Sequence, residues 1–300
     1  MKKSFLLLLL LCFSYHLKAQ QQEPNLFTSL KESFVLLESS PSNEERNTTQ
    51  KQIESDLLTL LNKPGSWSLN FDSLRYISCL TAPDKRFRIL TWVISTVDRS
   101  SYTFGGLIQE KQDAQGHSKV HRLVDVSALL DKPDTAKLKG NAWYGAYYNT
   151  ILVNKKGAKR IYTFIGWKGA SRFTTKKVID LLSFEKSGPV FASPLLPVID
   201  RKDKKGKKTC NRIVFEYNAE VVMSLRYDNA SKHIIFDHLA PSEPALEGIY
   251  AAYGPDLSYD GLIWKKGHWN YLPDIEAKNS DSKGLGSKRR KKEKTLYRPK

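Results

Sequence analysis

The stretch RIVFEYNAEVVMSLRYDNASKHIIFDHLAPSEPALEGIYAAYGPDLSYDGLIWKKGHWNYLPDI, residues 212–275, decides the fold. Short apolar runs in it are separated by compact turns rich in Asn, Asp, Ser and Gly, residues that tolerate the backbone angles of turns. Several short strands at this spacing are typical of a β-sandwich or a barrel-like body. We therefore predict a mostly β (α+β) chain built on an antiparallel meander.

Six strands are predicted in this stretch. They are 213–217, 221–227, 233–237, 249–253, 261–264 and 268–272. The first three are expected to pair as a three-stranded meander, with turns near Asn218-Ala219 and at 228–231.

Upstream, an alternating pattern of period two begins at Trp67. Residues 87–94 are apolar on both faces, which is typical of a central, covered strand. Two hairpins are predicted after it: 102–110 with 119–126, and 142–153 with 160–167. The apolar run 178–184 is a strand or a helical segment, since its period does not separate the two.

Residues 21–63 are predicted to form a pair of helices before the β-rich region 64–277. Apolar residues recur at helical spacing, Ser42 and Glu45 match a capping box, and Pro64 with Gly65 marks the end of the second helix. Such a pair would cover one face or end of a sheet. Alternatively, it is a separate element that binds a partner, which would make the protein a structural component of an envelope complex.

The N-terminus has the pattern of a secretory signal at residues 1–20. Lys2 and Lys3 precede an apolar run at 5–13, which is too short to span a bilayer. We expect an exported protein that is not transmembrane: periplasmic, associated with the outer envelope, or secreted. In such a compartment Cys79 and Cys210 form either a disulfide or two unpaired thiols.

The formal net charge of +17 is concentrated in short segments. Lys2, Lys3 and Lys18 contribute three of these charges, residues 278–300 contribute eight and residues 201–208 contribute five, which leaves one for the rest. The segment 278–300 is predicted to be a disordered basic tail, because it cannot bury enough apolar surface to offset the entropy of ordering. It suits contact with anionic surfaces, and no specific nucleic-acid partner is expected.

Aromatic residues are concentrated in the second predicted hairpin. Tyr144, Tyr148 and Trp167 belong to this group, which is either core or a platform on which a glycan or peptide ligand stacks. The acid–imidazole pair Asp237-His238 ends a predicted strand. We predict these five residues as the candidate ligand-binding set.

A second candidate site is Asp256-Leu257-Ser258-Tyr259-Asp260-Gly261. Oxygen side chains at Asp256, Ser258 and Asp260, followed by Gly261, match the first half of a calcium loop. Gly267 stands where the last carboxylate of that loop belongs. The segment is therefore either a calcium site completed from elsewhere or an Asx-type turn capped by glycine.

The chain contains none of the sequence patterns GxSxG, HExxH, P-loop or GxGxxG. We therefore expect a non-catalytic envelope or secreted protein that binds a glycan, a peptide or an envelope component. One alternative is a hydrolase of cell-wall or dietary glycans, which needs only two suitably placed carboxylates. Its candidate acids are Asp237, Glu247, Asp256 and Asp260.

Four segments resemble a family of exported Bacteroidota proteins that has no assigned activity. They are 177–184, 214–217, 236–241 and 253–256, and the resemblance extends over roughly residues 70–275. It implies export and one folded β-rich body, and it implies no catalytic residues.

Overall fold

The computed structural model describes residues 26–201 and 208–275. The predicted signal at 1–20, residues 202–207 of the basic run and the predicted tail at 278–300 lie outside the described residues. Within the described part of the chain, no helix has the length and hydropathy that crossing a bilayer requires.

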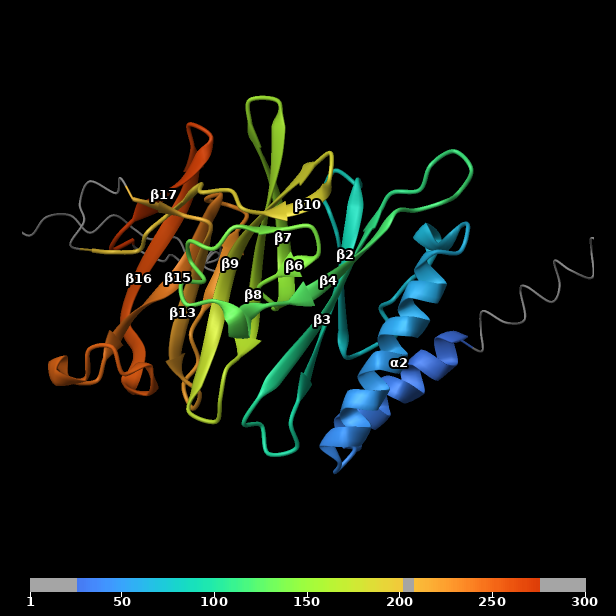
Figure 1. The fold of residues 1–300 in the computed structure, drawn as a ribbon. Helices are drawn as coiled ribbons and strands as arrows, with labels where there is room; N and C mark the ends of the chain where they lie inside the picture. The colour runs from blue at the N-terminus through green and yellow to red at the C-terminus, as the bar shows by residue number, and fades with distance from the viewer. Residues whose placement is uncertain (1–25, 202–207, 276–300) are drawn as a thin grey trace, which may run out of the picture.

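The described elements stack as a helical layer followed by three large sheets, and a two-stranded pair accompanies them (Figure 1). The chain is mostly β and its sheets are antiparallel, apart from one short parallel pairing, as the sequence predicted. The sheets do not close into a barrel, so the sandwich-like alternative describes them better.

The first sheet has the strand order β1-β2-β3-β4-β6. Its strands are β1 (Ile77–Thr81), β2 (Phe87–Ser95), β3 (Tyr102–Glu110), β4 (Val120–Asp125) and β6 (Ala142–Trp143). Strand β2 has Phe87 and Ile89 buried on one face and Leu90 and Trp92 buried on the other. This confirms the prediction of a strand covered on both sides.

The central sheet has the order β5-β10-β9-β8-β7, and β13 pairs with residues 174–180 of β9 on the edge that β10 occupies further along at 183–185. Its strands are β5 (Leu138–Lys139), β7 (Tyr147–Lys156), β8 (Lys159–Gly169), β9 (Thr174–Glu185), β10 (Gly188–Phe191) and β13 (Arg212–Asn218). The ambiguous run at 178–184 therefore lies in a strand, β9.

The C-terminal sheet has the order β14-β15-β16-β17. Its strands are β14 (Leu225–Asp228), β15 (His233–Pro241), β16 (Tyr253–Lys265) and β17 (His268–Leu272). A short pair, β11 (Leu196–Pro197) with β12 (Thr209–Cys210), precedes β13. The described residues also form four 3-10 turns. Turn η1 (Ser66–Ser68) lies between α2 and β1, and η2 (Ser127–Leu129), η3 (Pro244–Leu246) and η4 (Tyr250–Ala252) lie between strands.

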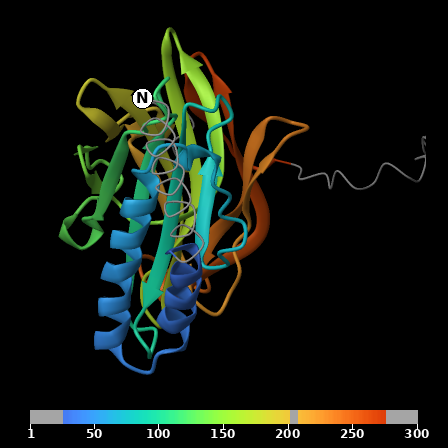
Figure 2. The same cartoon turned by 90° about the vertical axis from the view of Figure 1, so that its right-hand side faces the viewer.

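The helical layer consists of a helix over residues 26–39 and α2 (Asn43–Leu61). The Ser42 hydroxyl accepts a hydrogen bond from the Glu45 N–H, which confirms the predicted N-cap. Glu45 does not complete the capping box, because its carboxylate accepts the Ser40 hydroxyl instead. The helices lie over the outer face of the first sheet (Figure 2), as predicted for a pair that covers a sheet.

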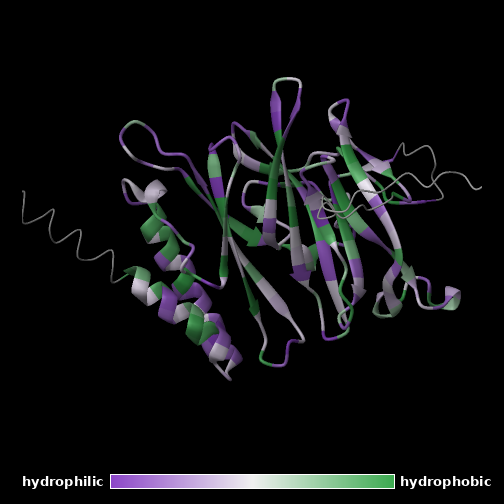
Figure 3. Ribbon diagram, turned by 180° about the vertical axis from the view of Figure 1, so that it is seen from behind, coloured by the Kyte–Doolittle hydropathy of each residue, from purple (hydrophilic) through white to green (hydrophobic). Residues whose placement is uncertain are grey.

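Three apolar cores hold these layers together, and hydrophobic residues accordingly run through the helices and all three sheets (Figure 3). Core 1, between the helices and the first sheet, includes Leu30, Phe34, Ile53, Leu90 and Trp92. Core 2, between the first and central sheets, includes Phe87, Ile89, Trp143, Tyr148 and Phe164. Core 3, between the central and C-terminal sheets, includes Ile179, Phe215, Phe236, Leu262 and Trp269.

The predicted three-stranded meander over 213–237 is wrong in its first pairing, because β13 does not pair with β14, and correct in its second, because β14 pairs with β15 across the turn at 228–231. All seven residues of β13 pair with β9, which lies in a different sheet from β14 and β15. Residues 219–224 connect the central sheet to the C-terminal sheet, and only Met223 of this segment is buried in core 3. The predicted strand at 221–227 is therefore shortened to β14, and Val222 in the crossing segment is 85% exposed.

Two other predicted strands are absent from the described chain. Residues 249–253 form the 3-10 turn η4 and the start of β16, with Ile249 and Tyr250 exposed. The alternation that begins at Trp67 belongs to turn η1 and an irregular segment. Arg88 holds that segment, because its buried guanidinium donates to the carbonyls of Ser66 and Leu69.

Candidate functional site

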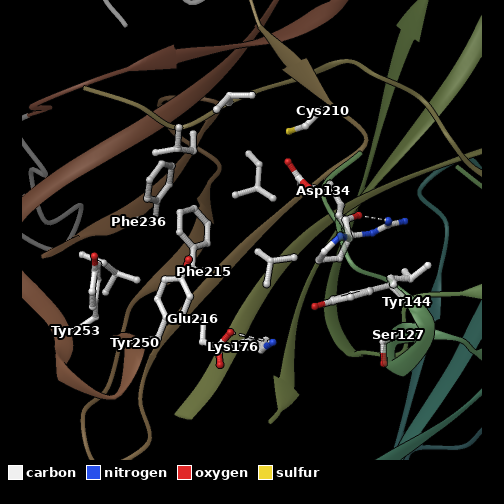
Figure 4. Close-up of a pocket in the computed structure, with 18 of the residues that line it drawn as sticks. Ser127, Asp134, Tyr144, Lys176, Cys210, Phe215, Glu216, Phe236, Tyr250 and Tyr253 are labelled. Atoms are coloured by element: carbon white, nitrogen blue, oxygen red, sulfur yellow. Dashed lines mark hydrogen bonds and ion pairs between the residues drawn. The ribbon is translucent and has the colours of Figure 1, made fainter. Parts of the chain in front are cut away.

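A groove of about 740 Å³ runs along β13 at the edge of the central sheet; we call it the β13 groove. One wall consists of residues from the 127–134 loop and Tyr144, on the core 2 side. The other wall, on the core 3 side, carries most of the aromatic side chains, which are Phe215, Phe236, Tyr250 and Tyr253. Figure 4 shows this aromatic group facing Tyr144 and Ser127 across the groove.

The backbone of β13 is unpaired on its groove side. Among the described residues, β13 pairs with β9 alone. The Ala219 N–H donates to the Phe173 carbonyl at 2.9 Å, and in an antiparallel ladder such bonded residues recur at every second position. The odd-numbered residues of β13 therefore turn their N–H and C=O groups to β9. Val214 and Glu216 turn theirs outward, into the groove.

Two contacts set the ends of this open edge. At one end the Arg212 N–H, also directed outward, donates to the Asp134 carbonyl at 3.2 Å. At the other end the Asn218 side-chain amide donates to the Ala251 carbonyl at 2.7 Å. The open stretch between them covers five residues, 213–217, a length of about 17 Å in an extended strand.

The groove carries more acidic than basic side chains that are free to meet a ligand. Lys176 pairs with Glu216 at 2.9 Å, which neutralises both. Asp131 and Asp134 also line the groove, and no described residue pairs with their carboxylates. The carboxylate of Asp237 accepts the Ser224 N–H and has no cationic partner among the described residues.

Arg212 lines the groove and is fully occupied by the protein itself. Its guanidinium donates to Asp180 at 3.3 Å and to the carbonyls of Pro133 and Ala136. Burial raises the pKa of Asp180, and the nearby Arg212 opposes that rise. Tyr148 also donates to Asp180. Because Arg212 of β13 donates to two carbonyls of the 133–136 loop, the network holds that loop against β13. It therefore builds the wall of the groove and leaves no charge for a ligand.

The nucleophile candidates in the groove are not activated. Burial and the nearby Asp134 raise the pKa of the Cys210 thiol to about 12, so it stays protonated at neutral pH. Burial likewise raises the pKa of the Tyr144 hydroxyl. The arrangement of these groups suits binding better than nucleophilic catalysis.

The predicted calcium residues lie within β16, and their side chains form a network centred on Arg201. Arg201 Nη2 lies 2.7 Å from Asp260 Oδ1 and 2.8 Å from Ser258 Oγ. Asp260 is fully buried and also accepts from His238, Tyr271 and the backbone. Burial alone would raise the pKa of Asp260, but these hydrogen bonds, led by that from Arg201, hold it below the ordinary value of 3.8.

The Asx-type turn that the sequence suggested is present inside this strand. The Ser258 N–H and hydroxyl both donate to Asp256 Oδ1, where the pairing of β15 with β16 shifts register. Within residues 26–201 and 208–275, no group of three or more His, Cys, Asp or Glu side chains is placed to hold a metal ion. Calcium binding at Asp256, Ser258 and Asp260 was one of two alternatives, and these observations leave it untested.

Three of the five predicted ligand-binding residues, Tyr144, Asp237 and His238, line the β13 groove. The other two do not. Tyr148 is fully buried in core 2, where it hydrogen-bonds Trp143 and Asp180. Trp167 packs edge-on against Tyr102. For most of the hairpin aromatics, the interpretation as core is the correct one, because Trp143, Tyr144, Tyr148, Tyr162 and Phe164 are all buried.

Sequence reasoning missed the open edge itself. It also missed Phe215 and the loop acids Asp131 and Asp134. A signal for that edge was present, because β13 contains Glu216 between apolar residues and follows a charged run, as edge strands often do. The missing information was the partner of β13, which depends on pairing between residues more than 30 positions apart. The predicted disulfide alternative is also settled, since Cys79 and Cys210 are both free.

Comparison of the chain with protein-family models, with curated proteins and with solved structures gave no match. The resemblance to exported Bacteroidota proteins therefore stays a prediction, and the function has to be argued from the groove.

Proposed function

We propose that this is an exported, non-catalytic binding protein whose ligand lies in the β13 groove. The observation that carries the proposal is the open edge of β13 between an aromatic wall and a wall with unpaired carboxylates. Concave, largely apolar sites with a few fixed polar groups are typical of ligand pockets. The proposed export rests on the charged and apolar pattern at residues 2–13.

The glycan-hydrolase alternative gains no support from its four candidate acids. Asp237 lines the groove, but Asp256 and Asp260 belong to the Arg201 network of β16. Glu247 lies on an exposed turn and does not line the groove. A pair of carboxylates facing one cleft, which this chemistry requires, is not formed among these four.

The test is a binding screen of the protein against an array of peptides and an array of oligosaccharides in 0.15 M salt. We expect wild-type protein to retain a defined set of array members. Tyr250→Ala should weaken their binding about tenfold, because Tyr250 is a half-exposed aromatic of the groove wall and such anchors dominate binding energy.

Ile249→Ala is the matched control. Ile249 is the neighbouring residue, is 54% exposed and does not line the groove. Its truncation should leave binding unchanged. If no array member binds, or if Tyr250→Ala binds as wild type does, the groove is not the binding site and the proposal is wrong.

A further inference from the structure

We propose that the β13 groove binds an extended peptide by adding it as a further strand to the central sheet, with alternating basic and apolar residues in that peptide. This inference rests on the proposed function and specifies its ligand. The backbone N–H and C=O groups of Val214 and Glu216 point into the groove and have no hydrogen-bond partner among the described residues.

A peptide main chain matches this edge better than a glycan does. Alternate residues of an extended peptide present an N–H and a C=O at the same spacing as β13, so each outward residue can exchange two hydrogen bonds with the ligand. The unpaired edge of β13 ends at the contacts with Asp134 and Ala251, so the bound segment is limited to about five residues. Strand addition uses an exposed sheet edge, and pockets for alternate side chains beside that edge give it specificity.

The two walls determine the side chains of the peptide. Residues of an added strand alternate between the two faces of the sheet. One set would face Phe215, Phe236 and Tyr250 on the core 3 side, which favours apolar side chains. The other set would face the loop that carries Asp131 and Asp134, whose carboxylates have no described partner, so lysine or arginine side chains are favoured.

The probe for the test is a fluorescein-labelled, N-acetylated octapeptide of alternating lysine and valine, titrated by fluorescence anisotropy in 0.15 M salt. Binding by wild-type protein is expected. Replacing every lysine with glutamate should weaken binding at least tenfold. The double variant Asp131→Asn/Asp134→Asn should bind the lysine peptide more weakly than wild type does. It should bind the glutamate peptide at least as tightly as wild type does.

Backbone methylation separates strand addition from binding by side chains alone. Two further peptides carry N-methyl groups on all lysines or on all valines. In an added strand only one of these sets turns its N–H toward β13. One methylated peptide should therefore lose at least tenfold in affinity while the other binds within threefold of the parent. Equal effects on both peptides, whether loss or retention, would overturn strand addition.

A protein variant tests the same hydrogen bonds from the other side. Val214→Pro removes an outward N–H and leaves the bonded ladder to β9 formally intact, because proline is tolerated where a strand edge faces outward. This variant should lower the affinity for the lysine–valine peptide at least tenfold. The control Val214→Ala, which keeps the N–H, should change that affinity less than threefold. If Val214→Pro does not fold, the methylated peptides still decide the question.

The outcomes separate the two proposals. Suppose that the peptide binds and Tyr250→Ala weakens it, while methylation and Val214→Pro do not. The groove is then the binding site, and strand addition is wrong. If the peptide does not bind at a concentration of about 1 mM, the assignment of a peptide ligand is wrong. It is also wrong if an oligosaccharide displaces the peptide from the groove. If Tyr250→Ala also leaves the affinity unchanged, both proposals are wrong.

Discussion

At the scale of single residues, Asp260 shows how a carboxylate that looks like a metal ligand in sequence can serve as a structural anchor. It accepts from Arg201, His238, Tyr271 and the Asp274 N–H, and its side chain is fully buried. It thereby joins the segment after β11 to β15, β17 and the chain beyond β17. Sequence spacing identified Asp260 as an oxygen donor but could not show that Arg201 is its partner.

This anchor predicts a specific dependence of stability on pH. Because the pKa of Asp260 in the folded protein lies below its ordinary value of 3.8, ionised Asp260 stabilises the fold above about pH 4. That contribution is lost as the pH falls through the lowered pKa. Asp260→Asn should cost about 2–3 kcal/mol at pH 7, the range for hydrogen bonds to a buried charged group.

Urea denaturation of wild type and Asp260→Asn between pH 7 and pH 2 measures the effect. The gap between the two free energies of unfolding should shrink below pH 4. Glu247→Gln, a change to an exposed acid, should stay within about 0.5 kcal/mol of wild type at pH 7. A gap that is independent of pH would mean that the charge of Asp260 does not contribute.

At the scale of elements, local pattern identified strands well and their partners poorly. The strand β2, both strands of the β3–β4 hairpin and the final hairpin of β16 and β17 follow from alternation and turn residues. The partner of β13 does not, because its pairing with β9 joins residues more than 30 positions apart and no local pattern records such a contact. In the folded protein β13 pairs with β9, and its other edge therefore stays unpaired and forms the open edge of the groove.

The element β16 also bears on calcium. A calcium ion at Asp256, Ser258 and Asp260 would have to displace Arg201, which contacts both Ser258 and Asp260. We therefore expect the melting temperature to be the same in millimolar calcium and in chelator. A site saturated at a hundredfold excess over its Kd would add about 2.7 kcal/mol of stability. A calcium-dependent rise that Asp256→Ala abolishes would restore the calcium site.

At the scale of the whole molecule, the helices and the sheets share one core. Leu30, Phe34 and Ile53 of the helices pack in core 1 with Leu90 and Trp92 of β2, and all five are almost completely buried. This arrangement argues against the hypothesis of a detachable helical pair, whose removal would leave the β body folded. Removal of the helices would instead expose the apolar face of the first sheet that packs in core 1.

The shared core makes a prediction for equilibrium unfolding. Phe34→Ala should cost about 3–5 kcal/mol, the range for a fully buried phenylalanine. Leu36→Ala, on the same helix but 42% exposed, should cost far less. Helical signal in the far ultraviolet and fluorescence of the buried Trp92 and its fellow tryptophans should be lost together in one transition, at a lower urea concentration in Phe34→Ala. If the helical signal is lost first and the fluorescence stays at the wild-type midpoint, the helices form a separate unit and the groove stands on a β body that folds without them.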